Sequence, residues 1–219
     1  PSLLHPEEIV DAFRKGGGIA YERLHPEIPE SIDRMHRAWF EHLLTGQWIP
    51  DIPGLPDRLS EGIRVLDVGC GLGRSTAAMA RAYPHSQFLG IDPHRPSIER
   101  ADELASEHRG DNLRFRSIAL EQLADGTSFD LIVAIDCIHD MADPVGVLGA
   151  IRERLEPDGM LLWSEPAGST HPANNTAPLP RLRAALSIYH CLTVSLACDG
   201  AGLGTLIGEE GARELAGLA

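Results

Sequence analysis

The residues best suited to chemistry lie where a short apolar stretch, Val65–Val68, runs into closely spaced glycines, Gly69, Gly71 and Gly73. Glycines let the backbone turn tightly and approach a ligand, and the helix expected next presents free N–H groups and a positive dipole end. Asp67, at the carboxyl end of the expected strand, can accept a hydrogen bond from a ligand ammonium. The segment predicts a cradle for a small molecule with amino and carboxylate groups. The alternative is a strand-to-helix turn without a ligand.

A second acidic residue follows the next expected strand. Asp92 lies 21 residues after Gly71, a spacing at which an acid can hold both ribose hydroxyls of a nucleoside. The alternative is a helix-capping or turn aspartate before Pro93. A nicotinamide dinucleotide would require glycine or alanine in the last place of the GxGxxG/A pattern, and Arg74 occupies that place. The pattern therefore predicts a nucleoside cofactor and weighs against NAD.

The elements expected to position these residues alternate short apolar runs with helix-length amphipathic stretches, which is the βαβ pattern of a parallel sheet. The expected strands cover residues 63–68, 87–91, 113–117, 129–135 and 160–164. The helices expected between them cover residues 74–82, 96–109, 120–124 and 144–155, the last ended by Pro157 and a turn at Asp158-Gly159. The fold class is α/β, an open, doubly wound and mostly parallel sheet with helices on both faces.

The chain on either side of this core is expected to be largely helical. Two helices, 6–15 and 29–44, precede it, separated by Gly16–Gly18, and a proline-rich linker covers 48–56. After the fifth strand we expect a polar loop, a helix, a glycine-rich stretch and a final helix, at 167–180, 182–196, 200–208 and 209–218. We predict a helical cap and linker at 1–58 and a ligand-binding domain at 59–219, with a lid or substrate-binding insertion at 167–208.

Composition excludes several classes of function. The chain has 219 residues, 43% of them hydrophobic and 23% charged, as in ordinary globular proteins. Its 19 basic and 32 acidic side chains give a net charge of −13, which repels a nucleic-acid backbone. The single lysine, Lys15, precedes Gly16, so no GxxxxGK[ST] phosphate loop exists. The four cysteines have no zinc-type spacing, and no apolar run reaches the ~20 residues of a membrane span. We therefore expect no metal, no membrane and a cytoplasmic location.

Four segments in this order resemble the class I S-adenosylmethionine-dependent methyltransferases: VLDVGCGLG (65–73), LGID (89–92), FDLIVAID (129–136) and LEPDGMLLWSE (155–165). The resemblance implies a Rossmann-like fold and methyl transfer from S-adenosylmethionine to a small-molecule acceptor, with S-adenosylhomocysteine as product. It also implies a set of cofactor-binding residues: Asp67, Gly69, Cys70, Gly71, Gly73, Asp92, Pro93, Ala119, Leu120 and Asp136.

Each part of the cofactor has an expected partner by the same resemblance. Asp67 and the glycines hold the methionine part, and Asp92 holds the ribose. The loop after the third strand holds the adenine. In that loop Ala119 stands where an aspartate usually meets the adenine amino group, so the backbone or Glu121 would have to serve.

A narrower resemblance covers nearly the whole chain. Residues 13–18, 135–140, 189–196 and 202–205 are similar to bacterial methyltransferases that carry a winged-helix domain ahead of the catalytic one. We expect that domain, and the antiparallel strands that finish the family's sheet, to be missing here, leaving five strands rather than seven. The winged-helix resemblance leaves one alternative function open, a regulatory module that senses the cofactor without turnover.

His139 and Asp140 follow the fourth expected strand, at the sheet edge where the cofactor is expected. Methyl transfer needs a nucleophile in line with the S–CH₃ bond, and a base if that nucleophile carries a tightly held proton. A histidine titrates near neutral pH, so His139 could take the proton while Asp140 orients it and raises its basicity. The alternative is a histidine that only shapes the pocket.

The first two helices and the stretch that follows them hold Trp39, Phe40 and Trp48, which cover the cofactor pocket or form a dimer face. The alternative is a purely structural cap. Apolar positions in the helix expected at 182–196 pack against the core or a partner. We expect a homodimer that uses the N-terminal helices and this later helix.

Overall fold

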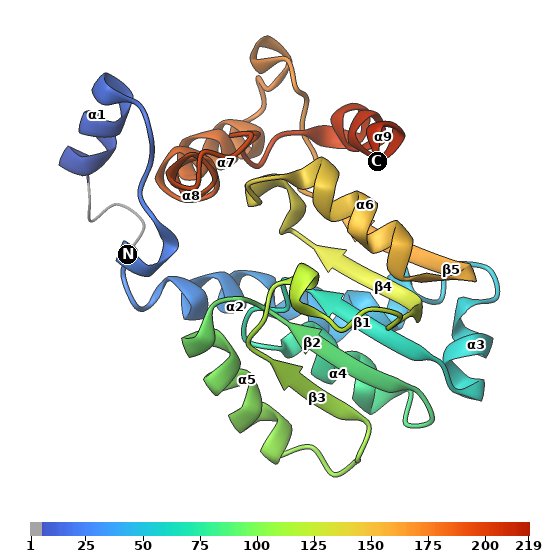
Figure 1. Cartoon of the computed structure of the whole chain (residues 1–219). Helices are drawn as coiled ribbons and strands as arrows, with labels where there is room; N and C mark the ends of the chain where they lie inside the picture. Colours follow the sequence, from blue (N-terminus) through green and yellow to red (C-terminus); the bar gives the residue numbers. More distant parts are fainter. Residues whose placement is uncertain (1–5) are drawn as a thin grey trace. The chain divides into compact units, whose positions relative to one another are not determined.

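A computed structural model describes residues 6–219 of the chain (Figure 1). Contacts among the described residues divide them into two units. The first unit comprises residues 6–28, 135–152 and 164–219, and the second comprises residues 29–134 and 153–163. The predicted boundary between residues 58 and 59 stays a prediction, and residues 1–5 of the predicted cap lie outside the described part.

Five strands form one sheet within residues 6–219, in the order β3-β2-β1-β4-β5. They are β1 (Arg64–Val68), β2 (Gln87–Ile91), β3 (Leu113–Arg116), β4 (Phe129–Ile135) and β5 (Leu155–Ser164). β1 pairs in parallel with β2 and β4, and β2 pairs in parallel with β3. The Val, Leu and Ile side chains of the central strands β1 and β4 are buried, as is typical of parallel sheets. The predicted α/β class with a mostly parallel sheet is confirmed.

The strand order creates a switch point beside β1. The chain runs from β1 outward through β2 to β3 and then returns to the other side of β1 with β4. Ligands of open α/β sheets bind at the carboxyl ends of the strands where the order reverses. The loop after β1 begins at this point.

Helices of the second unit pack around β1 to β3 (Figure 1). They are α2 (Ile28–Ala38), the π-helical η2 (Trp39–Trp48), α3 (Leu55–Glu61), α4 (Arg74–Ala82), α5 (Arg95–Ser106) and the short η3 (Leu120–Gln122). α4 contacts β2, β3, α5 and η2. The helix at 74–82 begins and ends where the sequence predicts.

The expected linker at 48–56 is wrong at both ends, because η2 ends at Trp48 and α3 begins at Leu55. Pro56 lies in the first turn of α3, where the missing N–H costs no hydrogen bond. Leu55 and Leu59 are buried and anchor the helix. The expected single helix at 29–44 is also wrong, since α2 ends at Ala38 and η2 continues the chain to Trp48.

The fifth strand is longer than expected. The helix before it, α6 (Pro144–Arg154), ends one residue before β5 begins at Leu155. Pro157 disfavours helical geometry at the preceding residue, which explains why the helix stops there. The expected turn at Asp158-Gly159 falls inside the strand.

The first unit is helical and contains the chain's last segment. Besides most of α6, it holds α1 (Pro6–Lys15), η1 (Tyr21–Arg23), η4 (Ile138–Asp140), η5 (Pro172–Asn174), α7 (Pro178–Tyr189), α8 (Cys191–Ala197) and α9 (Gly208–Leu218). The single helix expected at 182–196 is broken at His190, whose φ of −139° and ψ of −89° are not helical. None of the helices in the described part of the chain is long and apolar enough to cross a bilayer.

Candidate functional site

Asp67 anchors the glycine loop that follows β1. It is 2% exposed, and its Oδ2 accepts hydrogen bonds from Ser75 Oγ at 2.6 Å and Thr76 Oγ1 at 2.7 Å, both in the first turn of α4. Burial raises the pKa of Asp67 to about 6, while the two hydroxyl bonds oppose the rise. The carboxylate therefore joins the end of β1 to the start of α4. The predicted bond from a ligand ammonium stays a prediction.

We expect Asp67→Asn to remove part of the pH dependence of stability. Because the pKa of Asp67 is raised, the folded chain binds this proton more tightly than the unfolded chain, whose Asp titrates near 3.8. The wild-type free energy of unfolding therefore falls as pH rises from about 4 to about 6. The Asp67→Asn variant lacks this pH-dependent contribution to the free energy of unfolding, which is about 3 kcal/mol. Denaturant unfolding of both proteins at several pH values checks it, and equal pH dependence would contradict it.

The three loop glycines have left-handed backbone angles, with φ of 68° at Gly69, 52° at Gly71 and 77° at Gly73. Gly73 is closely packed, since a Cβ there would lie 2.9 Å from Ala101 Cβ. At Gly71 a Cβ would meet no atom within 4 Å. Gly71 is thus the place in the loop where a ligand can approach the backbone.

Asp92 lies directly beside this loop. Its Oδ2 accepts a hydrogen bond from Gly71 N at 3.0 Å, and its Oδ1 accepts one from His94 N at 2.8 Å. Burial raises the pKa of Asp92, and both backbone bonds oppose the rise. Each carboxylate oxygen has a second lone pair for a further donor. The structure thus joins the two motifs that the sequence analysis singled out, 21 residues apart.

Arg74 links the cradle to α2 and η2. Its Nε and Nη2 donate to the two carboxylate oxygens of Asp33, each at 2.6 Å, and its Nη1 donates to Glu41 Oε1 at 3.1 Å. The paired carboxylate of Asp33 raises the pKa of Arg74. The sequence analysis used Arg74 only to weigh against NAD and missed Asp33. These contacts fix the first residue of α4, directly after Gly73.

The loop expected to hold adenine makes bonds of its own. Ala119 N donates to Gln122 Oε1 at 2.7 Å, Leu120 is buried, and Glu121 is exposed. Ser117 Oγ donates to Pro93 O at 3.4 Å, a long contact that brings this loop beside the turn after β2. The Ala119 N–H already has a partner, so an adenine contact through it would require Gln122 to move. The adenine role of this loop stays a prediction.

A separate polar cluster forms in the first unit around His139. This side chain is 1% exposed, and its Nδ1 lies 2.5 Å from Glu165 Oε2 and 3.9 Å from Asp136 Oδ1. Asp136 has a φ of 55°, and its N donates to Ser164 O at 2.8 Å. The sequence analysis missed Glu165, although an acid directly after the fifth strand is the signal that could have found it. The expected orienting role of Asp140 stays a prediction.

The environment of His139 corrects the expectation that it titrates near neutral pH. Burial alone would lower the pKa of His139, but hydrogen bonds with Cys191 and Glu165, and the charge of Glu165, raise it well above its ordinary value. His139 is thus held as an imidazolium beside a buried carboxylate. Before it can accept a proton from a substrate, it must first lose this one.

The same cluster offers three metal-ligand atoms. Single ligand atoms of Asp136, His139 and Glu165 all lie within 4.8 Å of one another. One imidazole and two carboxylates can bind a divalent ion, whereas the sequence analysis expected no metal. The separation of 2.5 Å between His139 Nδ1 and Glu165 Oε2 is a hydrogen-bond distance. The two side chains are therefore hydrogen-bonded to each other in this structure.

A sheet of order 3-2-1-4-5, a glycine loop after β1 and an acid after β2 define the class of α/β domains that bind nucleoside cofactors. A family model described as a methyltransferase domain matches residues 59–208. The chain therefore belongs to this methyltransferase family, and the resemblance to class I S-adenosylmethionine-dependent methyltransferases is confirmed.

Curated relatives align over about half of the chain. A ubiquinone biosynthesis O-methyltransferase of Cereibacter sphaeroides is 35% identical over 105 residues, which are 48% of this chain and 41% of the relative. The enzyme of the same name from Neisseria meningitidis is 34% identical over 106 residues, 47% of this chain and 44% of the relative. The aligned part spans less than half the length of these relatives.

Solved structures share the fold over nearly the whole chain. TnmH is 21% identical with a TM-score of 0.69, covering 97% of this chain and 61% of that one. A putative O-methyltransferase of Nostoc punctiforme is 17% identical with a TM-score of 0.67, covering 97% of this chain and 60% of that one. At these identities the likeness concerns the fold alone.

Proposed function

We propose that this chain transfers a methyl group from S-adenosylmethionine to a hydroxyl of a small-molecule acceptor and releases S-adenosylhomocysteine. The observation that carries the proposal is the hydrogen bond from Gly71 N to Asp92 Oδ2, which brings together the glycine loop and the acid that we propose to bind the ribose. Membership of the methyltransferase family supports the reaction, and the names of the O-methyltransferase relatives support an oxygen acceptor. No observation on the described residues favours the alternative of a regulatory module.

The residues of the second unit fit the cofactor. The open face at Gly71 leaves room for the methionine part, and the N–H groups at the start of α4 attract its carboxylate. Asp92 accepts hydrogen bonds from the ribose hydroxyls, while Asp67 holds the loop in position. When bound, the sulfonium supplies an electrophilic methyl group. In the first unit, His139 removes the acceptor's proton and Glu165 holds the imidazole ring.

We expect Asp92→Ala to weaken the binding of S-adenosylmethionine and S-adenosylhomocysteine by at least about 1.5 kcal/mol, roughly tenfold. The substitution removes a charged acceptor for the two ribose hydroxyls. Calorimetric titration with both compounds measures the effect. Asp111→Ala is the matched control, since Asp111 is an exposed aspartate before β3. Unchanged affinity of Asp92→Ala would reject the cofactor site.

We also propose that the chain forms a homodimer. α1 and α7 of the first unit both carry large exposed apolar side chains, among them Phe13, 69% exposed, and Leu182, 55% exposed. Such surface supports association through these helices. Sedimentation at tens of micromolar should give a dimer, and Phe13→Glu with Leu182→Glu should shift it to monomer. A wild-type monomer at that concentration would overturn this proposal.

We also propose that this segment has no nucleic-acid partner and that it is cytoplasmic. The net charge of −13 supports the absence of a nucleic-acid partner. The four cysteines are free thiols in the structure, which supports a reducing, cytoplasmic location.

A further inference from the structure

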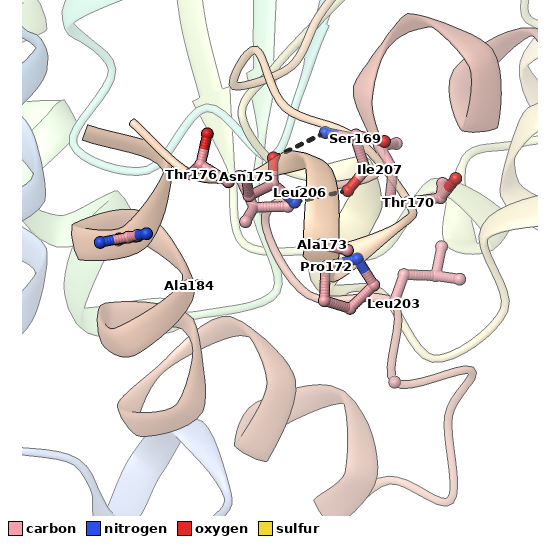
Figure 2. A pocket seen from close by; sticks show the side chains of 12 residues that line it. Ser169, Thr170, Pro172, Ala173, Asn175, Thr176, Ala184, Leu203, Leu206 and Ile207 are labelled. Carbon is pink, nitrogen blue, oxygen red and sulfur yellow. Dashed lines mark hydrogen bonds between the residues drawn. The ribbon is translucent and has the colours of Figure 1, made fainter. Parts of the chain in front are cut away.

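The first unit contains a cavity of about 790 Å³ that shares no residue with the glycine cradle or with the cluster around His139 (Figure 2). It lies between the segment after β5, the start of α7 and the segment before α9. Its lining comes from residues 169–176, from Arg181 and Ala184 of α7, and from residues 202–207. A volume of this size is typical of small-molecule sites.

The wall formed by residues 169–176 is fixed by its own hydrogen bonds. Asn175 Oδ1 accepts from Ser169 N at 3.0 Å, and Asn175 Nδ2 donates to Ser169 O at 2.8 Å, as the dashed lines in Figure 2 show. Asn174 Nδ2 and His171 N also donate to Ser169 Oγ, each at 3.2 Å. This side of the cavity is therefore preformed.

The other walls are joined by close packing. Thr205 N donates to the buried Ser187 Oγ at 3.0 Å, which fastens the segment before α9 to α7. A Cβ at Gly168 would lie 2.6 Å from Leu206 Cδ2 and 3.2 Å from Leu206 Cβ, so these two segments are closely packed. The cavity stays open although its three walls are tied together, and the small side chain of Ala184 leaves space within it.

The lining combines an apolar surface with one cation. Pro172, Leu203, Leu206 and Ile207 offer apolar contact, and no acidic residue lines the cavity. Arg181 is its single charged lining residue, and the Arg181 guanidinium has no hydrogen-bond or ion-pair partner among residues 6–219. The exposed Arg181 guanidinium attracts an anion locally, against the net charge of −13, and its planar fork matches a carboxylate.

We propose that this cavity is a binding site for a small carboxylate with an aromatic or otherwise apolar body. The carboxylate pairs with Arg181, and the body lies against the leucines and Ile207. Hydroxyls of Ser169, Thr170 and Thr176 offer further polar contacts. This site goes beyond the proposed methyl transfer, because it stands on residues that the transfer does not use.

Calorimetry with naphthoate tests the site, and naphthalenemethanol serves as the uncharged probe with the same ring. Naphthoate should bind the wild-type chain, and Arg181→Gln should weaken it by about tenfold or more while leaving the alcohol unchanged. Arg183→Gln is the matched control, because Arg183 lies on the same helix, donates to Ala167 O and does not line the cavity. Ala184→Trp should fill the cavity and weaken both probes.

Three results would overturn the proposal: no naphthoate binding at millimolar concentration, equal affinity in Arg181→Gln, or displacement of naphthoate by S-adenosylhomocysteine. The last would assign the probe to the cofactor cradle. Circular dichroism melting curves verify that each variant is folded. Retained naphthoate affinity in Gly71→Val would further support a site separate from the cradle.

Discussion

Gly71→Val is expected to abolish binding of S-adenosylmethionine and S-adenosylhomocysteine while the chain stays folded. The side chain would enter the open face of the loop, where a Cβ meets no protein atom within 4 Å and where the cofactor is proposed to lie. The φ of 52° at this position also disfavours a β-branched residue. No packing contact is lost in the folded state, so the expected decrease in the free energy of unfolding is the backbone strain of about 1 to 3 kcal/mol.

Gly126→Val separates blocked binding from backbone strain. Gly126 has a φ of 74°, and a Cβ there would also meet nothing within 4 Å, but it lies in the loop before β4. Calorimetric titration with S-adenosylhomocysteine and denaturant unfolding should be measured on both variants. We expect similar losses of stability and a loss of binding in Gly71→Val alone. If Gly71→Val binds as tightly as Gly126→Val, the loop is not the cradle.

The juxtaposition of the glycine loop and Asp92 could be predicted because it follows from strand order. Asp67 and Asp92 each follow an apolar run, and parallel neighbours end at the same edge of a sheet. The register that pairs Val68 with Ile91 therefore brings the two loops together, and the bond from Gly71 N to Asp92 completes the site. The apolar periodicity of short stretches of sequence is enough to predict where each strand, and therefore each loop, lies.

The partners of His139 and Arg74 could not be predicted, because they depend on contacts distant in sequence. Glu165 is 26 residues from His139, and Asp33 is 41 residues from Arg74. No periodic pattern specifies which of several acids such a side chain meets. Asp140 adjoins His139 in sequence, whereas Glu165, directly after β5, makes the contact that the structure describes.

The break at His190 has a similar origin. Apolar periodicity continues from α7 into α8 and predicts one helix. In the structure the rings of Tyr21 and His190 form a T-shaped contact with centroids 5.7 Å apart, and Ile19 N donates a hydrogen bond to Thr193 O at 3.2 Å. These are tertiary contacts between the N-terminal segment and the region of the helix break. Helix propensity depends on local sequence and does not include them.

His139→Ala is expected to lower turnover by about 10² to 10⁴ while cofactor affinity stays nearly unchanged, as the loss of a general base would. His139 follows β4 by four residues. Turnover and calorimetric affinity should be measured on the same variant. His42→Ala, which removes an exposed histidine of η2, is the control and should leave both unchanged.

The pH profile distinguishes a base from a residue that only fills space. Since Glu165 raises the pKa of His139, the imidazole is protonated at neutral pH and turnover should rise with pH as that proton is lost. Glu165→Gln removes the negative charge and lowers the pKa of His139, so the rise should move to lower pH. Rates measured across pH for wild type and both variants test this. Full turnover in His139→Ala, or an unchanged pH profile in Glu165→Gln, would show that His139 has only a structural role. Loss of cofactor binding in His139→Ala would instead show that His139 is part of the cofactor pocket.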